Sequence, residues 1–496
     1  MPSPRAASVA VVAMLALGVA IGSATSQLAQ SAGLTTILLE SSSPRQPAEG
    51  PEEAVEAAGA EAEEEGEASQ SSATPPPIEE EAPLIEEEGT FEEPVPALPE
   101  EEFEEPVGLP PVKHVFLIML GENGYEETFG ATSTSAYLAR DLPAQGELLP
   151  NYYAVAGSDL ANQIALISGQ GPTLETLANC PIYGDIVPGT ESSTASQVEG
   201  DGCVYPATAR TLAGELVEKK LKWKAYVEDM AKGAATGQPT SCRHPALGSP
   251  DPNHVPVPGD AYETWRNPFV YFHSIIDGEE CAAADVDLEQ LATDLRKEAK
   301  KFPALAYIVP NACHKGGEAV CEPGAPSGPA ATEETLRRIV PEIVKSPAYA
   351  EGGLILITSS LARQTGPTPD TGSCCATPVY GNVPEPGPSE IAPGGVKTTG
   401  GGGRVGLLLI SKFVKPGTVN EGVYYNHFSL LLTIEEMFGL EPIGYAAEPA
   451  TLGFEGSIFN AGEEGESTVV TRPSAMGPPA KRPPPAILSR ARSAAR

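Results

Sequence analysis

The sequence predicts an α/β fold class: a layered α/β/α domain with a mainly parallel sheet, flanked by disordered N- and C-terminal segments. Two observations predict the domain. Strand-like apolar runs alternate with helix-like segments over residues 112–459, and those runs are nearly unbroken, as in strands buried on both faces. A third observation predicts the flanks, because they are rich in Pro, have few aromatic residues and cannot offset the entropy of ordering.

The chain opens with an apolar segment, residues 1–27, in which Arg5 precedes a run of Ala, Val and Leu. This pattern is typical of a secretory signal peptide or of an uncleaved signal anchor. Both place the folded domain outside the cytoplasm. We therefore expect an extracytoplasmic protein, either secreted or anchored to a membrane through its N-terminus.

Residues 28–111 hold most of the net negative charge of a chain whose formal net charge is -36. Glutamate and proline dominate this stretch, and we expect an extended, disordered linker, with a partner-binding acidic tract as the alternative. Lys and Arg do not cluster in the predicted domain, so we expect no nucleic acid partner. The basic, Pro-rich tail over residues 460–496 is also predicted to be disordered.

The first predicted strand, residues 112–120, runs into a loop over residues 121–130 that carries Glu122 and Asn123. Open α/β sheets place their chemistry at such strand ends, so both residues are site candidates. Another apolar strand begins at Leu354 and ends in two hydroxyls, Ser359 and Ser360. The other expected elements are a helix over 160–170, a helix running into a strand over 211–230 and again over 288–311, a helical segment from 334 before Leu354, a strand within 403–411, and a helix from about Ser429.

Eight cysteines all lie in the predicted domain. In an exported chain an even number favours disulfides, and no pair of CxxC motifs indicates a zinc site. We expect Cys313 to pair with Cys321, which is close in sequence. The adjacent Cys374 and Cys375 are expected to pair with different partners.

Several motifs, in their order and spacing, resemble the bacterial phosphoesterase family that includes phospholipase C and acid phosphatase relatives, within the alkaline-phosphatase-like superfamily. They are KHVFLIMLGENGYEETFG, LPNYYAVAG followed by IALISGQ, WKAYVEDM, RNPFVYFHSI, YIVPN, GGGRVGLLLISKFVKPGT and YNHFSLLLTIEEMFGL. The resemblance implies an alkaline-phosphatase-like fold and a divalent metal at the strand ends. It also implies a Ser or Thr at a helix N-terminus that attacks phosphorus, in a phosphate ester or a phospholipid headgroup.

The resemblance assigns catalytic roles to three residues of this chain. Asn123 matches the amide that helps to hold the phosphoryl group. Asp159 stands at the place of the nucleophile, and Ser158 takes that role if the alignment shifts by one residue. An aspartate can form an acyl phosphate only where a metal offsets its repulsion from the phosphate.

The metal positions are only partly kept. Glu122 matches the first metal carboxylate and His427 the retained histidine, while His314 is a weaker candidate ligand next to Lys315, whose charge opposes a cation. Gly317 and Glu318 stand where a His-Asp pair is expected. Ser359 and Ser360 replace two acids, and neutral hydroxyls are poor ligands for a hard dication. The nearest acid downstream is Asp370.

The sequence therefore predicts an exported phosphoesterase-family domain, of the hydrolase type that acts on phosphate esters, with impaired catalysis. Three alternatives remain. The site works with Glu122, Asn123, Asp159 and His427; the domain is a non-catalytic binding or scaffold domain at the cell surface; or the acidic linker is the functional part. Retained histidines, His273 included, also suit a structural role in a core.

Overall fold

The computed structural model describes residues 108–317 and 321–460. The expected signal segment (1–27), all but the last four residues of the expected linker (28–111), Glu318 and all but the first residue of the expected tail (460–496) lie outside the described residues. No helix of the described part of the chain has both the length and the apolar character needed to cross a membrane.

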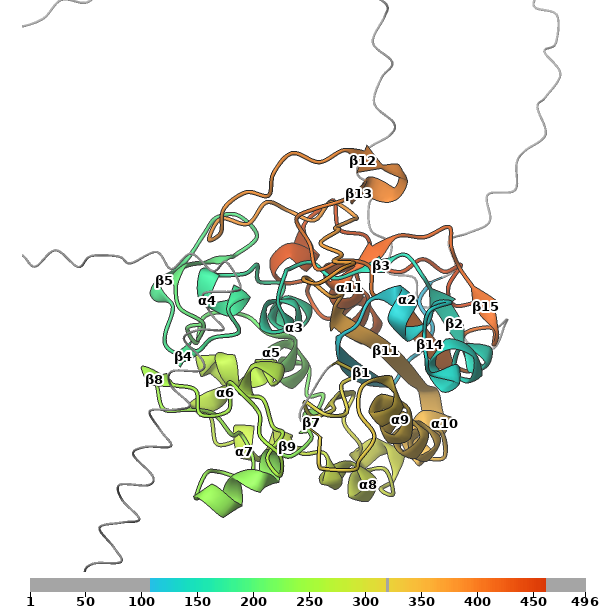
Figure 1. Ribbon diagram of the computed structural model, residues 1–496, viewed down its shortest axis with the longest axis horizontal. Helices are drawn as coiled ribbons and strands as arrows, with labels where there is room; N and C mark the ends of the chain where they lie inside the picture. Colours follow the sequence, from blue (N-terminus) through green and yellow to red (C-terminus); the bar gives the residue numbers. More distant parts are fainter. Residues whose placement is uncertain (1–107, 318–320, 461–496) are drawn as a thin grey trace, which may run out of the picture. The chain divides into compact units, whose positions relative to one another are not determined.

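An eight-stranded sheet forms the centre of the domain, with the strand order β15-β2-β14-β11-β1-β10-β7-β9 (Figure 1). The five strands from β11 to β9 are parallel to one another, whereas β14 is antiparallel to both β11 and β2. The strands are β1 (His114–Glu122), β2 (Glu147–Leu149), β7 (Trp223–Val227), β9 (Asp285–Asp287), β10 (Leu305–Val309), β11 (Gly353–Leu361), β14 (Leu407–Ser411) and β15 (Thr418–Val419). This confirms the predicted mainly parallel sheet.

Helices cover both faces of the sheet. They are α2 (Tyr125–Thr128), α3 (Asp159–Ser168), α4 (Leu174–Leu177), α5 (Leu212–Glu218), α6 (His273–Ile276), α7 (Cys281–Ala284), α8 (Glu289–Asp294), α9 (Pro329–Val344), α10 (Pro347–Gly352) and α11 (His427–Phe438). Further helical turns are η1 (Tyr137–Asp141), η2 (Pro143–Gln145), η3 (Met230–Thr236), η4 (Thr264–Arg266), η5 (Pro268–Tyr271), η6 (Ala299–Lys301), η7 (Pro393–Gly395) and η8 (Gly444–Ala447).

The side chains of β1 divide between two apolar clusters because successive residues of a strand point to opposite faces. Val115, Leu117 and Met119 pack with α3, α5 and α11, whereas the alternate residues Phe116 and Ile118 pack with α8, α9 and α10. Figure 1 shows these two helical layers on either side of β1 and β11. The layered α/β/α prediction is therefore confirmed, and the unbroken apolar strands are buried on both faces.

Four two-stranded sheets lie outside the main sheet. They are β3 (Tyr152–Tyr153) with β16 (Tyr425–Asn426), β4 (Ile182–Tyr183) with β8 (Ser249–Pro250), β5 (Val187–Glu191) with β6 (Val198–Asp201), and β12 (Ile391–Ala392) with β13 (Val396–Lys397). The pair β3 and β16 positions the site, because β3 comes shortly before α3 and β16 leads directly into α11.

All eight cysteines form disulfides: Cys180–Cys203, Cys242–Cys281, Cys313–Cys321 and Cys374–Cys375. The predicted Cys313–Cys321 pair is confirmed. The expectation that Cys374 and Cys375 have different partners is wrong, since they are bonded to each other. Cys375 lies in a turn with a φ of 63°, where neighbouring side chains can meet.

Candidate functional site

The end of β1 carries two of the predicted site residues. Glu122 is the last residue of β1, opposite Leu361 of β11, and Asn123 follows directly. Oε1 of Glu122 accepts a hydrogen bond from the backbone N–H of Gln364 at 3.1 Å. Nδ2 of Asn123 donates to the carbonyl of Lys315 at 3.2 Å. Both side chains thus tie the end of the strand to neighbouring loops.

Ser158 and Asp159 lie where α3 begins. Ser158 is the N-cap, and its Oγ accepts from the N–H of Ala161 at 3.3 Å while donating to the carbonyl of Thr176 at 2.8 Å. The buried Ser158 hydroxyl is therefore held at both its lone pair and its proton. Asp159 is the first helical residue, where the positive end of the helix dipole stabilises a carboxylate.

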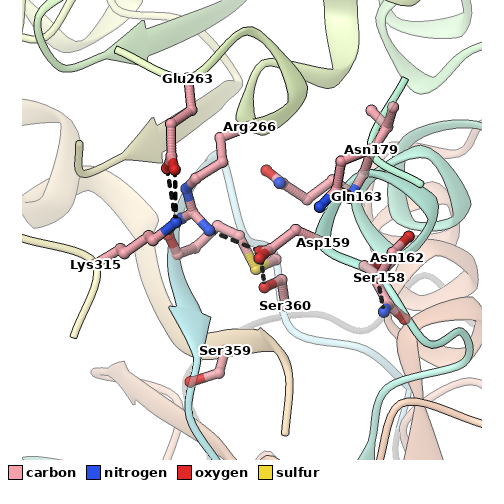
Figure 2. A network of polar contacts seen from close by, with 12 residues as sticks. Ser158, Asp159, Asn162, Gln163, Asn179, Glu263, Arg266, Lys315, Ser359 and Ser360 are labelled. Carbon is pink, nitrogen blue, oxygen red and sulfur yellow. Dashed lines mark hydrogen bonds and ion pairs between the residues drawn. The ribbon is translucent and has the colours of Figure 1, made fainter. Parts of the chain in front are cut away.

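The Asp159 carboxylate is paired with a cation of the chain itself. Arg266, the last residue of η4, places Nη1 2.8 Å from Oδ1 of Asp159, and the hydroxyl of Ser360 donates to the same oxygen (Figure 2). Nη2 of Arg266 donates to the carbonyl of Met119 in β1 at 2.7 Å. The side chains of Arg266 and Asp159 are only 1% and 6% exposed, so the ion pair is almost fully desolvated.

Strand β11 explains the two serines that end its apolar run. It continues to Leu361, so Ser359 and Ser360 are buried residues within the strand rather than residues beyond its end. Ser360 points to Asp159, whereas Figure 2 shows Ser359 directed away from that contact, as the alternation of a strand requires. Among the described residues, Oγ of Ser359 has no hydrogen-bond partner.

A second buried ion pair lies beside the first. Nζ of Lys315 donates to both carboxylate oxygens of Glu263, at 2.9 and 2.7 Å (Figure 2). It also lies 4.3 Å from the centre of the Trp265 ring. Burial raises the pKa of Glu263, and the charges of Lys315 and Arg266 oppose that shift. Arg266 and Lys315 are thus balanced by two carboxylates, since Arg266 pairs with Asp159 and Lys315 with Glu263.

His427 is fully buried at the start of α11, and both of its ring nitrogens are engaged. Nε2 lies 2.9 Å from the carbonyl of Ser360, and Nδ1 lies 2.8 Å from the hydroxyl of Tyr152. Burial lowers the pKa of His427 to about 4, so the ring is neutral at physiological pH. A carbonyl only accepts, so Nε2 carries the proton and Nδ1 accepts from Tyr152. Neither nitrogen is left for a metal.

His314 lies apart from His427, in the turn after β10. Its Nδ1 donates to Oε2 of Glu228 at 2.8 Å, and Glu228 also lies 3.7 Å from Arg338. This hydrogen bond to the carboxylate raises the pKa of His314, against the opposing effect of burial. His273 forms ion pairs with Asp185 and Asp277.

The loop that carries Asp370 folds back toward the end of β1. Nε2 of Gln364 donates to the carbonyl of Asp370 at 2.8 Å, and the N–H of the same Gln364 reaches Glu122. The two carboxylate oxygens of Asp370 accept backbone N–H groups of Gly372 and Arg404, each at 2.9 Å. Asp370 thus holds the loop in shape.

The residues at these strand ends do not fit a divalent cation, which needs several anionic or imidazole donors converging on one point. Asp159 is paired with Arg266, and both nitrogens of His427 are engaged. Within residues 108–317 and 321–460, side chains able to ligate a metal converge at Cys242, Cys281 and Asp285, where the two sulfurs are bonded to each other. No such group surrounds Glu122 in that part of the chain.

Of the predicted residues, the structure brings Asp159 and His427 together through Ser360, and Asn123 next to Lys315. Sequence reasoning missed Arg266 and Glu263, which complete the two ion pairs. One signal was available: a carboxylate in so apolar a helix requires a cation, and Arg266 opens the motif RNPFVYFHSI. The partner of Lys315 carried no signal of that kind.

A family model described as the Phosphoesterase family matches residues 129–441. No curated protein matches the chain. Similar solved structures include a putative sulfatase from Bacteroides thetaiotaomicron, with 11% identity over 72% of this chain and 76% of that chain and a TM-score of 0.38. A protein in the alkaline phosphatase superfamily from Vibrio parahaemolyticus is 11% identical over 69% of this chain and 72% of that chain, with a TM-score of 0.36. A phosphonate monoester hydrolase of Agrobacterium radiobacter is 11% identical over 68% of this chain and 78% of that chain, with a TM-score of 0.35.

Proposed function

This chain belongs to the Phosphoesterase family, and we propose that it is an extracytoplasmic binding or scaffold domain that has kept the fold of that family without metal-dependent hydrolysis. The family match agrees with the resemblance that the sequence motifs carry. The single observation that carries the proposal is the buried ion pair between Asp159 and Arg266, because it occupies the position at which the family's nucleophile is expected.

A nucleophile must be free to approach phosphorus. Asp159 is buried, paired with Arg266 and hydrogen-bonded by Ser360, so attack would require breaking both contacts inside a desolvated site. Ser158, the alternative, donates its hydroxyl proton to a backbone carbonyl and caps α3. Neither side chain is prepared to attack.

Arg266 and Lys315 are buried cations beside these strand ends, and each is paired with its own carboxylate. An ion pair of this kind leaves little net charge to attract a phosphate ester. With His427 neutral and engaged at both nitrogens, we propose that no divalent cation is held at Glu122. Phosphate esters and phospholipid headgroups are accordingly not proposed as substrates.

The proposed location rests on the cysteines. Four disulfides among the described residues fit an oxidising compartment, which agrees with the predicted signal peptide or signal anchor. Secretion and anchoring through residues 1–27 both remain predictions.

The test is a metal and activity assay on the full chain. The protein is incubated in turn with Zn²⁺, Ca²⁺, Mg²⁺ and Mn²⁺, desalted, and measured by elemental analysis and by hydrolysis of p-nitrophenyl phosphate and bis(p-nitrophenyl) phosphate. We expect no stoichiometric metal and the same background turnover in wild type, Glu122→Ala and Glu126→Ala. Glu126 is the matched control, a carboxylate four residues from Glu122 that pairs with Arg404.

Stoichiometric metal together with turnover that Glu122→Ala abolishes and Glu126→Ala keeps would contradict the proposal. That outcome would support the working phosphoesterase on Glu122, Asn123, Asp159 and His427. The linker alternative is tested separately by deleting residues 49–105, because loss of a cellular phenotype with a folded domain would assign the function to the linker.

A further inference from the structure

The disulfide Cys242–Cys281 lies against a buried carboxyl group. Cys281 begins α7, and Asp285 begins the edge strand β9 immediately after it, as Figure 1 shows for the two elements. A carboxylate oxygen of Asp285 lies within 4.8 Å of both sulfur atoms. The backbone N–H of Cys242 donates to the Asp285 carbonyl at 2.9 Å, which fixes the two together.

The Asp285 side chain is fully buried and only half satisfied. Its Oδ2 accepts from Nδ2 of Asn267 at 2.7 Å, whereas its Oδ1 has no hydrogen-bond partner among the described residues. Burial raises the pKa of Asp285 to about 7, with Asn267 opposing the shift. The titratable neighbour that senses its charge is the phenol of Tyr262, which donates to the carbonyl of Arg243 at 2.7 Å.

The two cysteine residues differ in their exposure to solvent. Cys281 is 3% exposed and belongs to the apolar core, whereas Cys242 is only partly buried against that core. A reductant from solution therefore meets Cys242 first. The sulfur that must leave is then Cys281, and a thiolate is a poor leaving group in apolar surroundings, which raise the pKa of a thiol.

We infer that Cys242–Cys281 is a thiol–disulfide exchange site for an external dithiol, with Cys242 as the attacked sulfur and Asp285 as the proton donor to Cys281. The inference is independent of the proposed loss of hydrolysis, since it uses none of the residues around Asp159.

The exchange balances in two steps. First, a thiolate of the dithiol attacks Sγ of Cys242 and forms a mixed disulfide with it. The bond between the sulfurs of Cys242 and Cys281 breaks, and Sγ of Cys281 takes the bonding electron pair. Sγ of Cys281 then takes the proton of the Asp285 carboxyl. The second thiolate of the dithiol then attacks the mixed disulfide, so that the dithiol leaves as a disulfide and Cys242 as a thiolate. Cys242 and Asp285 regain protons from solvent, and two electrons have passed from the dithiol to the protein.

The role of Asp285 predicts an unusual pH dependence. Once the rate is divided by the thiolate fraction of the reductant, it should fall as pH rises past 7, because the carboxyl has lost its proton and its charge repels the departing thiolate. Replacing Asp285 by Asn removes both effects. The normalised rate of the variant should then be independent of pH, below wild type at pH 6 and above it at pH 9.

The experiment follows reduction of the full chain by dithiothreitol from pH 6 to pH 9, with differential alkylation and peptide mass spectrometry that report each disulfide separately. We expect the normalised rate of Cys242–Cys281 to fall at least ~10-fold over this range in wild type and to be flat in Asp285→Asn. The Cys313–Cys321 disulfide, which also joins a buried cysteine to a partly exposed one, is measured in the same samples as the internal control and should be flat in both proteins. A wild-type profile of Cys242–Cys281 that matches this control would overturn the inference, whether or not the variant folds.

A second measurement tests the direction of attack. Glutathione, a monothiol, traps the first mixed disulfide in wild-type protein. We expect the adduct on Cys242, and an adduct mainly on Cys281 would overturn the assignment of the leaving sulfur.

Discussion

Nη1 of Arg266 lies 2.8 Å from Oδ1 of Asp159 in a part of the domain that excludes water. The pair joins the start of α3 to η4, two elements more than a hundred residues apart in sequence, and Arg266 also reaches β1 through the Met119 carbonyl. Taking both charges out of water is costly, and their attraction offsets that cost only while both partners are present. The pair therefore leaves this contact without net charge and holds α3, η4 and β1 together.

Removing one partner of this pair should cost much more than removing both. Asp159→Asn leaves the guanidinium of Arg266 buried and unpaired, and Arg266→Met leaves the carboxylate of Asp159 buried and unpaired. Each substitution should lower the free energy of unfolding by about 3–5 kcal/mol. The double variant leaves no buried charge at this contact. Its loss should be smaller than the sum, as measured in a double-mutant cycle by urea unfolding with the disulfides intact. Strictly additive losses would show that the two charges do not depend on each other.

Gly121 in β1 is predicted to be essential for the second ion pair. A Cβ at this position would lie 2.8 Å from both Cγ and Cδ of Lys315, so Gly121→Ala must displace the Lys315 side chain from Glu263. We expect a loss of about 1–3 kcal/mol in unfolding free energy. Gly317→Ala is the matched control, because no atom of residues 108–317 and 321–460 lies within 4 Å of a Cβ there.

A mutant cycle between Gly121 and the ion pair of Lys315 with Glu263 identifies the cause of this loss. In a Lys315→Ala, Glu263→Gln background the clashing atoms are absent, and the cost of Gly121→Ala should fall. An equal cost in both backgrounds would assign the effect to the backbone of β1 instead of to Lys315.

His427 predicts a loss of stability in acid. The pKa of His427 is about 4 in the folded protein, because of burial, against 6.5 for an unperturbed histidine, so the unfolded chain binds the proton first as pH falls. The titration of His427 does not change the free energy of unfolding above pH 6.5. Between pH 6.5 and pH 4 it should lower that free energy by about 3 kcal/mol. The difference in melting temperature between wild type and His427→Gln should therefore shrink from pH 7 to pH 4.5.

His273 is a control of opposite sign. Burial alone would lower its pKa, but its hydrogen bonds to Asp185 and Asp277 outweigh that effect and raise it. Protonated His273 thus stabilises the folded protein below the pKa that it has in the unfolded chain. This stabilisation is lost as pH rises through the higher pKa that it has in the folded protein. The advantage of wild type over His273→Gln should be larger at pH 5.5 than at pH 8. If both histidine variants respond alike, the pH effect comes from other groups.

The fold could be predicted from the sequence because its signals are local. Unbroken apolar strands and the helices between them follow from side-chain periodicity, and the disulfide between Cys313 and Cys321 follows from a short loop. The site depends on contacts across long separations. Arg266 ends the short helical turn η4 and Glu263 directly precedes it, so neither belongs to a periodic pattern, and nothing local indicates that they meet Lys315 and Asp159.

The serines show how one boundary changes an interpretation. The apolar run alone places Ser359 and Ser360 at the end of a strand, where two replaced acids would leave a metal site without ligands. Because β11 runs to Leu361, the two hydroxyls point to opposite faces, and only Ser360 reaches Asp159. Strand ends are set by pairing with neighbours, here with Glu122 of β1 opposite Leu361, which a single sequence does not reveal.

Glu435 in α11 is predicted to destabilise the protein at neutral pH. It is fully buried; its Oε1 accepts from the N–H of Ile443 at 3.2 Å, and its Oε2 has no hydrogen-bond partner among the described residues. Burial raises the pKa of Glu435 to about 9, against 4.5 for an unperturbed glutamate. The folded form keeps its proton where the unfolded chain releases it, so stability falls as pH rises from 4.5 to 9, by about 3 kcal/mol at pH 7.

Glu435→Gln removes this titration while its amide oxygen can still accept from Ile443. The variant should therefore equal wild type near pH 4.5 and exceed it by about 3 kcal/mol at pH 7, measured by urea unfolding at both pH values. Glu441→Gln is the matched control, since the Glu441 side chain is 83% exposed and the substitution should change little at either pH. A gain for Glu435→Gln that is the same at both pH values would mean that packing, and not a buried carboxyl, limits stability at this position.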